Sequence, residues 1–208
     1  MDIANAYNSW SSQYDTNDNK TRDLEALSLQ KILVGKSFKH CLEIGCGTGK
    51  NTSWLLSICD QITAIDLSKG MLEIAKNKIQ SDKVNFIEVD ITKDWTFAKH
   101  TYDLVTFSLM LEHIEDLDAV FQKVSKVTTV GSLVYIGELH PFKQYAGSKA
   151  RFETESGTQV VTCFNHHVTD FIQAANASGF QLIHLDEQFD DADRSQLPRI
   201  LNLVFEKL

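Results

Sequence analysis

The sequence predicts a doubly wound α/β fold, in which an open, mostly parallel sheet carries helices on both faces. Two observations predict it. The apolar pair Cys41-Leu42 runs into a glycine loop, EIGCGTG at 43–49, and strand-like and helix-like segments then alternate along most of the chain. Such alternation is typical of parallel sheets, because consecutive parallel strands need a crossover that is usually a helix.

The composition is that of a globular chain with one domain, residues 1–208. It is 43% hydrophobic and 23% charged, which allows a sizeable core. The net charge of −8 and the lack of a basic stripe argue against nucleic acid or a membrane surface as partner. Neither a signal peptide nor an apolar run of membrane-spanning length is seen. The four cysteines show no metal-ligand spacing, so reduced thiols and a cytoplasmic location are expected.

The segment before the glycine loop, residues 1–35, predicts a helical cap. Its first part carries Tyr7, Trp10 and Tyr14, which share one face of a helix because they are three, four and seven residues apart. This face either docks on the domain or forms a lid whose rings cover a cationic or planar ligand. A second helix is expected over 22–33.

The glycine loop predicts a ligand site. Glycines at 45, 47 and 49 let backbone approach a ligand closely, and a helix from about Lys50 points its free N–H groups at the loop. A dinucleotide fingerprint has the spacing G-x-G-x-x-G. Here G-x-G-x-G follows Glu43, whose charge would repel a pyrophosphate and suit an ammonium or sulfonium. We therefore expect S-adenosylmethionine (SAM); the alternative is a tight turn without a ligand.

Acidic residues end or follow the next two predicted strands. The strand at 61–66 ends in Asp66, where a doubly wound sheet places a carboxylate on a ribose diol. Its alternative role is the N-cap of the next helix. The strand at 84–89 leads into Asp90 and Ile91, which could hold and pack an adenine ring. The alternative for Asp90 is a solvated loop aspartate.

The rest of the chain predicts a seven-stranded sheet with one insertion. Further strands are expected over 102–107, 131–139, 180–186 and 200–207, with helices over 117–127 and 168–178. The segment 140–168 departs from the alternation and contains a possible hairpin with its turn at Ser156-Gly157. Ligands of such sheets bind beyond the carboxyl ends of the strands, and the glycine loop, Asp66, Asp90, Ser108 and the insertion all fall there.

Several stretches resemble motifs of the class I SAM-dependent methyltransferases. They are LEIGCGTG at 42–49, AIDLS at 64–68, VDI at 89–91, YDLV at 102–105 and LEHI at 111–114. The segment from Tyr7 to Tyr14 also looks like the aromatic cap of members that act on small molecules. The resemblance covers nearly the whole chain and implies a Rossmann-like fold with an antiparallel C-terminal strand. It says little about the substrate.

The family pattern implies a set of cofactor contacts. The methionine part of SAM would meet the backbone of Gly45, Cys46 and Gly47, with Glu43 nearby and a backbone contact from Ser108 to its amine. Asp66 would accept the ribose hydroxyls. The other residues expected at the cofactor, around adenine or closing over it, are Leu67, Met71, Asp90, Ile91 and Tyr14.

The resemblance implies methyl transfer to oxygen or nitrogen of a small molecule by in-line displacement, with S-adenosyl-L-homocysteine as product. Positioning and desolvation carry most of such catalysis, and a base is needed only if the nucleophile arrives protonated. His140 is our first choice for the base because it follows the fifth strand at the active edge. His166 and His167 come next, and His113 is a further candidate. Any one of them could instead be structural.

The insertion concentrates cations in an acidic chain, namely Lys143, Lys149 and Arg151. They suggest an anionic substrate such as a carboxylate; the alternative is a solvated loop balanced by neighbouring glutamates. The residues assigned to the substrate are Tyr7, Trp10, His113, Tyr145 and Arg151.

No metal is expected. Relatives that bind Mg²⁺ carry E-x-x-E-H where this chain reads Leu109-Met110-Leu111-Glu112-His113, so a leucine replaces the first acidic ligand. Two other function classes stay open: a SAM-binding or interaction module without catalysis, and a dinucleotide oxidoreductase, against which Glu43 argues. The expected partner is a small-molecule substrate, and the expected assembly a monomer or homodimer.

Overall fold

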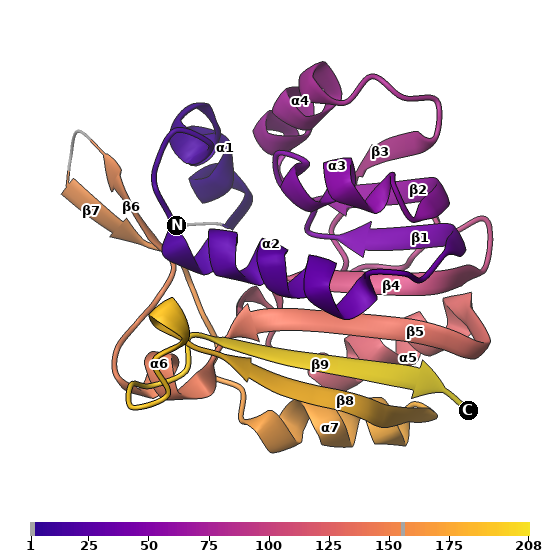
Figure 1. Ribbon diagram of the computed structural model, residues 1–208. Coiled ribbons are helices and arrows are strands. Elements are labelled where there is room, and N and C mark those ends of the chain that lie inside the picture. Colours follow the sequence, from indigo (N-terminus) through magenta and orange to yellow (C-terminus); the bar gives the residue numbers. More distant parts are fainter. Residues whose placement is uncertain (1–2, 155–156) are drawn as a thin grey trace.

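A computed structural model describes residues 3–154 and 157–208, which form a seven-stranded sheet in the order β3-β2-β1-β4-β5-β9-β8 (Figure 1). Neighbouring strands from β3 to β5 are parallel, whereas β9 runs antiparallel to β5 and β8. The predicted doubly wound sheet with an antiparallel C-terminal strand is confirmed. The strands are β1 (Phe38–Ile44), β2 (Cys59–Asp66), β3 (Val84–Glu88), β4 (Tyr102–Ser108), β5 (Thr128–Leu139), β8 (Phe180–Gln188) and β9 (Ile200–Lys207).

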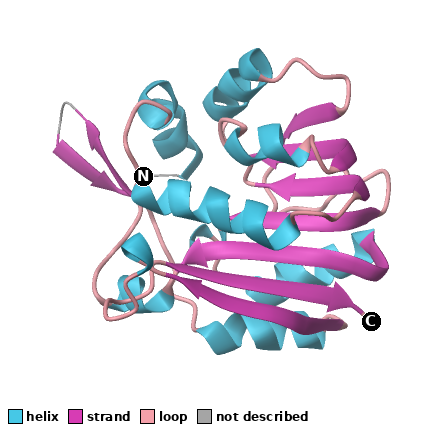
Figure 2. Cartoon of the chain, in the orientation of Figure 1, coloured by secondary structure: helices cyan, strands magenta, loops and turns pink. Residues whose placement is uncertain are grey.

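Helices cover both faces of the sheet (Figure 2). One face carries α2 (Lys20–Leu33), α3 (Lys50–Leu55) and α4 (Lys69–Lys78), and the other α5 (Leu117–Val127) and α7 (Val168–Ala177). The first face buries Leu29, Leu55 and Leu72, and the second buries Phe121 and Phe171. Helix α2, which the sequence assigned to the cap, therefore packs on the sheet as a core helix.

The arrowheads of the parallel strands point toward α1 (Ile3–Tyr14) and the hairpin of β6 (Arg151–Thr154) and β7 (Gly157–Val160) (Figure 1). Helix α1 is tied across this edge, because Asn8 Oδ1 accepts hydrogen bonds from the Ser68 hydroxyl and the Gly70 N–H. Asp15, just past α1, pairs with Lys78 of α4 at 2.7 Å. The predicted aromatic helix is thus confirmed as a helix.

The insertion contains a helix that the sequence did not predict. After β5, α6 (Pro141–Tyr145) begins with proline at its first position, where the missing N–H and fixed φ are tolerated. Short 3₁₀ helices, η1 (Leu111–His113) and η2 (Asp190–Ala192), complete the elements named here. The predicted hairpin is present, but Ser156 of its expected turn lies outside the described residues, as does the side chain of Arg151.

Two of the buried carboxyl groups lie on strands near the carboxyl edge of the sheet. Glu43 on β1 is 4% exposed and accepts a hydrogen bond from the Thr52 hydroxyl at 2.5 Å. Glu138 on β5 is 2% exposed and accepts the N–H groups of Met110 and Leu111 at 2.9 and 2.8 Å. Burial raises the pKa of each carboxyl to about 8, because the interior disfavours the charged form.

We expect these raised pKa values to make the protein less stable as the pH rises. The folded chain binds more protons than the unfolded chain between about pH 4.5 and about pH 8, so the free energy of unfolding falls across this interval by up to about 1.4 kcal/mol per pH unit for each carboxyl. Glu43→Gln keeps an acceptor for Thr52 and cannot ionise. Denaturant unfolding at a series of pH values should therefore show a shallower decline for this variant, whereas the exposed control Glu88→Gln should keep the wild-type slope. Equal slopes for wild type and Glu43→Gln would contradict the burial argument.

Candidate functional site

The glycine loop turns sharply between β1 and α3, and its N–H groups donate hydrogen bonds to the end of β2. Gly45, Gly47 and Gly49 have φ values of +75°, +54° and +82°, a backbone region that favours glycine. The N–H groups of Gly45 and Cys46 both donate to the Ile65 carbonyl, at 2.8 and 3.0 Å. The Gly47 N–H donates to Asp66 Oδ2 at 2.8 Å. The loop N–H groups of residues 45–47 therefore hold β2 in place, rather than standing free for a ligand.

The turn after β4 packs directly on the glycine loop. A Cβ atom on Gly45 would lie 2.9 Å from the Cβ of Met110, so a larger residue would displace that side chain. Leu109 has φ +54°, an uncommon conformation for leucine that the surrounding structure must hold. Glu138 holds it, because one of its oxygens accepts the next two N–H groups, of Met110 and Leu111. Three segments thus meet at one point: the loop, this turn and the end of β5.

A cavity of about 250 Å³, here called the glycine-loop cavity, lies at the carboxyl ends of β1, β2 and β4. All but two of the residues expected at the cofactor line it: Tyr14, Gly45, Gly47, Asp66, Leu67, Met71, Asp90, Ile91 and Ser108. Tyr7 and His113, expected at the substrate, line it too. Ile3 and Ala4 complete the wall on the side of α1, and no motif in the sequence indicated them.

The two aspartates at the cavity are oriented by backbone groups. Asp66 accepts the N–H of Gly47 on one oxygen and the N–H of Ser68 on the other, both at 2.8 Å. Burial raises the pKa of Asp66 although these bonds oppose the shift. Ser68, not Asp66, caps α4, so the N-cap alternative for Asp66 is wrong. Burial acts on Asp90 in the same direction, but its bonds from the Thr92 hydroxyl and N–H leave the pKa lowered.

Glu43 and Cys46 are the two expected cofactor residues that do not line the cavity. The Glu43 carboxyl lies under the loop against Thr52 of α3, and its pKa of about 8 leaves it mostly uncharged at neutral pH. The side chain of Cys46 is buried in the core beneath α3 and α4. The structure therefore corrects the expectation that a Glu43 charge guards the loop, because burial removes both its access and its charge.

A second cavity, of about 440 Å³, adjoins the first and shares Tyr7, Tyr14 and Leu109 with it. We call it the basic cavity, because its described lining includes four cations. Trp10, expected at the substrate, lines it as well, and so do two acidic residues, Asp18 and the buried Glu112. The four cations are Lys20, Arg22, Lys149 and Arg199.

The two arginines build the wall of the basic cavity, and the two lysines stand exposed at it. Arg199 pairs with Asp190 and donates to the Thr21 hydroxyl at 3.0 Å. Arg22 lies 4.0 Å over the ring of Tyr14 and donates to the backbone carbonyl of that residue. Of these cations, the sequence indicated Lys149 alone. The antiparallel course of β9 could have pointed to Arg199, because the residue that directly precedes such a strand lies at the carboxyl edge of the others.

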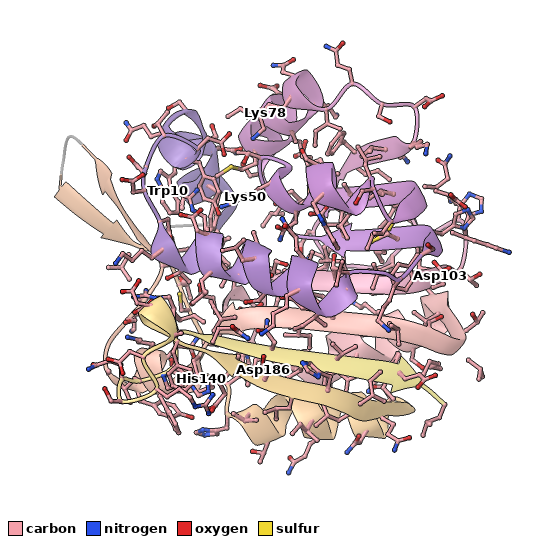
Figure 3. The ribbon with its side chains drawn as sticks, viewed as in Figure 1. Trp10, Lys50, Lys78, Asp103, His140 and Asp186 are labelled. Carbon is pink, nitrogen blue, oxygen red and sulfur yellow. The ribbon has the colours of Figure 1, made fainter. Side chains whose placement is uncertain are left out.

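The structure removes His140 from the site. Its ring is fully buried at the start of α6, and Figure 3 shows it well apart from Trp10 of α1. Nδ1 accepts the Phe142 N–H at 3.1 Å, so Nε2 carries the hydrogen and donates to Glu187 at 3.0 Å. Burial lowers the pKa of His140, against the opposing effect of Glu187. His140 lines neither cavity, and both of its ring nitrogens bond within the protein, so the expected base is a structural residue.

The other two expected bases also lie outside both cavities. His166 is buried and donates through Nε2 to the Ile114 carbonyl at 2.7 Å. His167 stands at the start of α7, where its ring pairs with the hydroxyl of Tyr145. Tyr145 is exposed and lines neither cavity, so the structure does not bring it to the substrate site. His166 thus joins two loops, and His167 and Tyr145 contact each other at the start of α7.

His113, in contrast, lies in the wall of the glycine-loop cavity. Its Nδ1 is 2.8 Å from the Thr162 carbonyl, and its Nε2 is 2.8 Å from the hydroxyl of Tyr7. Cys163 approaches the same ring, with Sγ 4.0 Å from Nδ1. Helix α1, the turn after β4 and the segment after β7 are therefore joined at this histidine.

Within residues 3–154 and 157–208, no group of three or more His, Cys, Asp and Glu side chains is placed to hold a metal ion. The same part of the chain contains no helix with the length and apolar character to cross a membrane. Cys41, Cys46, Cys59 and Cys163 are free thiols.

Comparison with known proteins identifies a domain within the chain. Residues 42–136 match the family described as "Methyltransferase domain". An uncharacterized methyltransferase of Emericella nidulans is 25% identical, over 89% of this chain and 78% of that protein. The malonyl-[acyl-carrier protein] O-methyltransferase of Priestia megaterium is 35% identical, over 52% of this chain and 42% of that protein. Several of the curated relatives are matched over less than half of their own length.

The fold is shared with solved methyltransferase structures. The complex of DhpI with S-adenosyl-L-homocysteine superposes with a TM-score of 0.77 and 22% identity, over 98% of this chain and 94% of that chain. The matching domain contains the glycine loop, Asp66, Asp90 and the turn after β4, which together form most of the glycine-loop cavity. The chain therefore contains a methyltransferase domain at residues 42–136 and has the fold of solved SAM-dependent methyltransferases, whose methyl donor is S-adenosyl-L-methionine.

Proposed function

We propose that the glycine-loop cavity binds SAM, that the basic cavity binds a small anionic acceptor, and that the chain transfers the methyl group to an oxygen or nitrogen of that acceptor. The observation that carries this proposal is the wall common to the two cavities, made of Tyr7, Tyr14 and Leu109. Because the two cavities adjoin at these residues, a donor in one cavity and an acceptor in the other would lie next to each other. This proximity is the main requirement of a displacement reaction.

The donor side fits SAM in its chemical character. Asp66 supplies a charged acceptor for the two ribose hydroxyls, since each of its oxygens has a lone pair beyond its bond to a backbone N–H. Leu67, Met71 and Ile91 supply apolar contacts for adenine, and Asp90 an acceptor for its amino group. The methionine part then extends toward Gly45 and Ser108.

The acceptor side fits a small acid. The chain carries a net charge of −8, so the four cations around one cavity do not follow from its composition. Lys20 and Lys149 are exposed, and their long stems would let them turn toward an anion. Trp10 packs edge-on against Tyr14, with ring centroids 4.8 Å apart, and adds an apolar wall for the body of the acceptor.

The reaction would be an in-line displacement at the sulfonium methyl group. Its positive charge is dispersed as the methyl group moves, so the protein contributes mainly by positioning the two molecules and excluding water. Tyr7 and Tyr14 line the glycine-loop cavity, and aromatic rings there would attract the sulfonium.

Asp66→Ala tests the donor site. We expect the variant to fold and to bind SAM and S-adenosyl-L-homocysteine about 10- to 100-fold more weakly, because a charged hydrogen bond contributes about 1.5–3 kcal/mol. Titration calorimetry measures both affinities. Asp60→Ala, an exposed aspartate at the opposite end of β2, is the matched control and should bind both as the wild type does. Unchanged affinity in Asp66→Ala would remove the ribose role.

A methyl-release assay on small organic acids and their neutral analogues, such as the amides, tests the acceptor site. We expect turnover with acids in preference to neutral analogues. Lys149→Ala should raise KM for a methylated acid about tenfold, a loss of about 1.4 kcal/mol, and leave SAM affinity unchanged. The control is Lys83→Ala, exposed beside β3 at the opposite edge.

Other results of this assay would select other functions. Equal turnover of acids and neutral analogues would reject the anionic acceptor and leave the methyltransferase activity standing. Tight binding of SAM without turnover of any compound would favour a binding or interaction module.

A further inference from the structure

We propose that Tyr7 and His113 form a proton relay, and that the methyl acceptor therefore carries a protonated hydroxyl or amino group in addition to the anion held by the basic cavity. The anion is then the group by which the acceptor is recognised, and the methyl group goes to the second group. This inference rests on the proposed function and narrows its substrate class to small hydroxy or amino acids.

The hydrogen bonds fix the tautomer of His113. A carbonyl oxygen only accepts, so the Nδ1 atom, 2.8 Å from the Thr162 carbonyl, carries the ring hydrogen. A neutral imidazole has a single N–H, which leaves a lone pair on Nε2. The Tyr7 hydroxyl, 2.8 Å away, must donate to that lone pair. The ring is thus held with its basic nitrogen against a tyrosine hydroxyl.

The position of Tyr7 connects this base to the acceptor. Tyr7 lines both cavities, whereas His113 lines the glycine-loop cavity. Since the single hydroxyl hydrogen of Tyr7 is given to His113, its oxygen can only accept from a third group. A hydroxyl or ammonium of the acceptor has the hydrogen that such an oxygen needs.

The surroundings favour a relay over a tyrosinate base. Burial raises the pKa of Tyr7 well above its ordinary value, and the nearby Tyr14, Glu112, Asp66 and Cys163 raise it further, so Tyr7 can take a proton only while it gives one up. These four residues, from α1, η1, β2 and the segment after β7, are the titratable groups that act most strongly on Tyr7.

Glu112 gives the protonated histidine a countercharge. It adjoins His113 in the chain and is 7% exposed, and its Oε2 has no hydrogen-bond partner among the described residues. Burial raises the pKa of Glu112, and the neighbouring His113 opposes that rise. An imidazolium at position 113 would therefore stabilise the Glu112 carboxylate, and the carboxylate would stabilise the imidazolium.

The transfer balances without any further reactant. A hydroxyl attacks the methyl carbon through a lone pair of its oxygen, whereas an ammonium first gives up its hydrogen and then attacks through the lone pair left on its nitrogen. In both cases the carbon–sulfur bond breaks with its electron pair left on the sulfur. The acceptor hydrogen passes to the Tyr7 oxygen as the Tyr7 hydrogen passes to His113 Nε2. The positive charge of the sulfonium thus ends on His113, which releases its proton to solvent after the products leave. A bare carboxylate as nucleophile would leave the relay unused.

The tautomer can be tested without knowledge of the substrate. Long-range ¹H–¹⁵N spectra of the imidazole rings in the ¹⁵N-labelled wild-type protein should show neutral His113 with its hydrogen on Nδ1, with the resonance identified by its loss in His113→Gln. A hydrogen on Nε2 would overturn the relay, because Nε2 could then accept nothing from Tyr7.

The kinetic test uses those hydroxy or amino acids of the panel that the wild type methylates. Tyr7→Phe and His113→Gln should each lower kcat about 10²- to 10⁴-fold, the range of a lost general base, with SAM affinity kept by calorimetry. The double variant should be no slower than the slower single variant, since the two act as a unit. His113→Gln should also lose the acidic limb of the kcat/KM–pH profile. Tyr102→Phe, which removes a buried hydroxyl at the amino end of β4, is the control and should turn over normally.

The outcomes separate the relay from the proposed function. If the variants keep the wild-type rate and pH profile, the relay is wrong and the methyltransferase stands. It is equally wrong if the analogues that lack the hydroxyl or amino group are methylated as fast as the parent acids. If the wild type methylates nothing, the proposed function fails, and the tautomer spectrum alone decides the relay. Should Tyr7→Phe fail to fold by circular dichroism, His113→Gln carries the kinetic test.

Discussion

The hydrogen bonds of the Glu138 carboxyl hold together the edge of the sheet on which both cavities depend. One oxygen of this buried side chain takes two successive N–H groups from the turn after β4. That turn can then place Leu109 in a left-handed conformation and bring Met110 against the bare Cα of Gly45. Leu109 belongs to the walls of both cavities, so one carboxyl fixes the boundary between them. The arrangement requires an acid to be kept mostly uncharged at neutral pH, which the surrounding core does by excluding water.

In the proposed reaction, the two cavities hold the two partners of the methyl transfer, and their chemistry differs accordingly. The glycine-loop cavity has apolar walls with two oriented aspartates, whereas the basic cavity has cations around an aromatic wall. Helix α1 belongs to both, through Tyr7 and Tyr14, and its hydrogen bonds to the start of α4 join it to the donor side. One helix therefore sets the relation between donor and acceptor. This suits a reaction in which positioning matters more than the creation of charge.

Sequence analysis located the fold and most of the donor site because their signals are local. Asp66 and Asp90 each lie at or just past the end of a strand, and a parallel sheet brings all such ends to one edge. His140 also follows a strand at that edge, but its partner Glu187 comes from a distant strand, and the pairing takes the ring out of the cavity. The motif around Glu43 predicted where this residue lies, next to the glycine loop. It could not predict that the carboxyl is mostly uncharged, because the protonation state depends on burial.

Most residues of the proposed acceptor site could not be predicted, because their contacts join segments that are distant in the sequence. Arg199 and Thr21 are joined at 3.0 Å although 178 residues separate them, and nothing in the spacing of either segment records that contact. The partnership of Tyr7 and His113 spans 106 residues in the same way. Both residues were candidates for the substrate, but their joint arrangement follows only from the packing of α1 over the turn after β4.

The positions of the lining residues along the sequence determine when each cavity can form during translation. The described residues around the glycine-loop cavity all lie between Ile3 and Ile114, whereas the basic cavity also needs residues 148–150 and Arg199, at the start of the last strand. A ribosome releases the N-terminal part first. The growing polypeptide therefore carries all the described residues around the glycine-loop cavity well before Arg199 of the basic cavity is made. A product interrupted ahead of β9 would contain the residues of the proposed donor site and lack part of the proposed acceptor site.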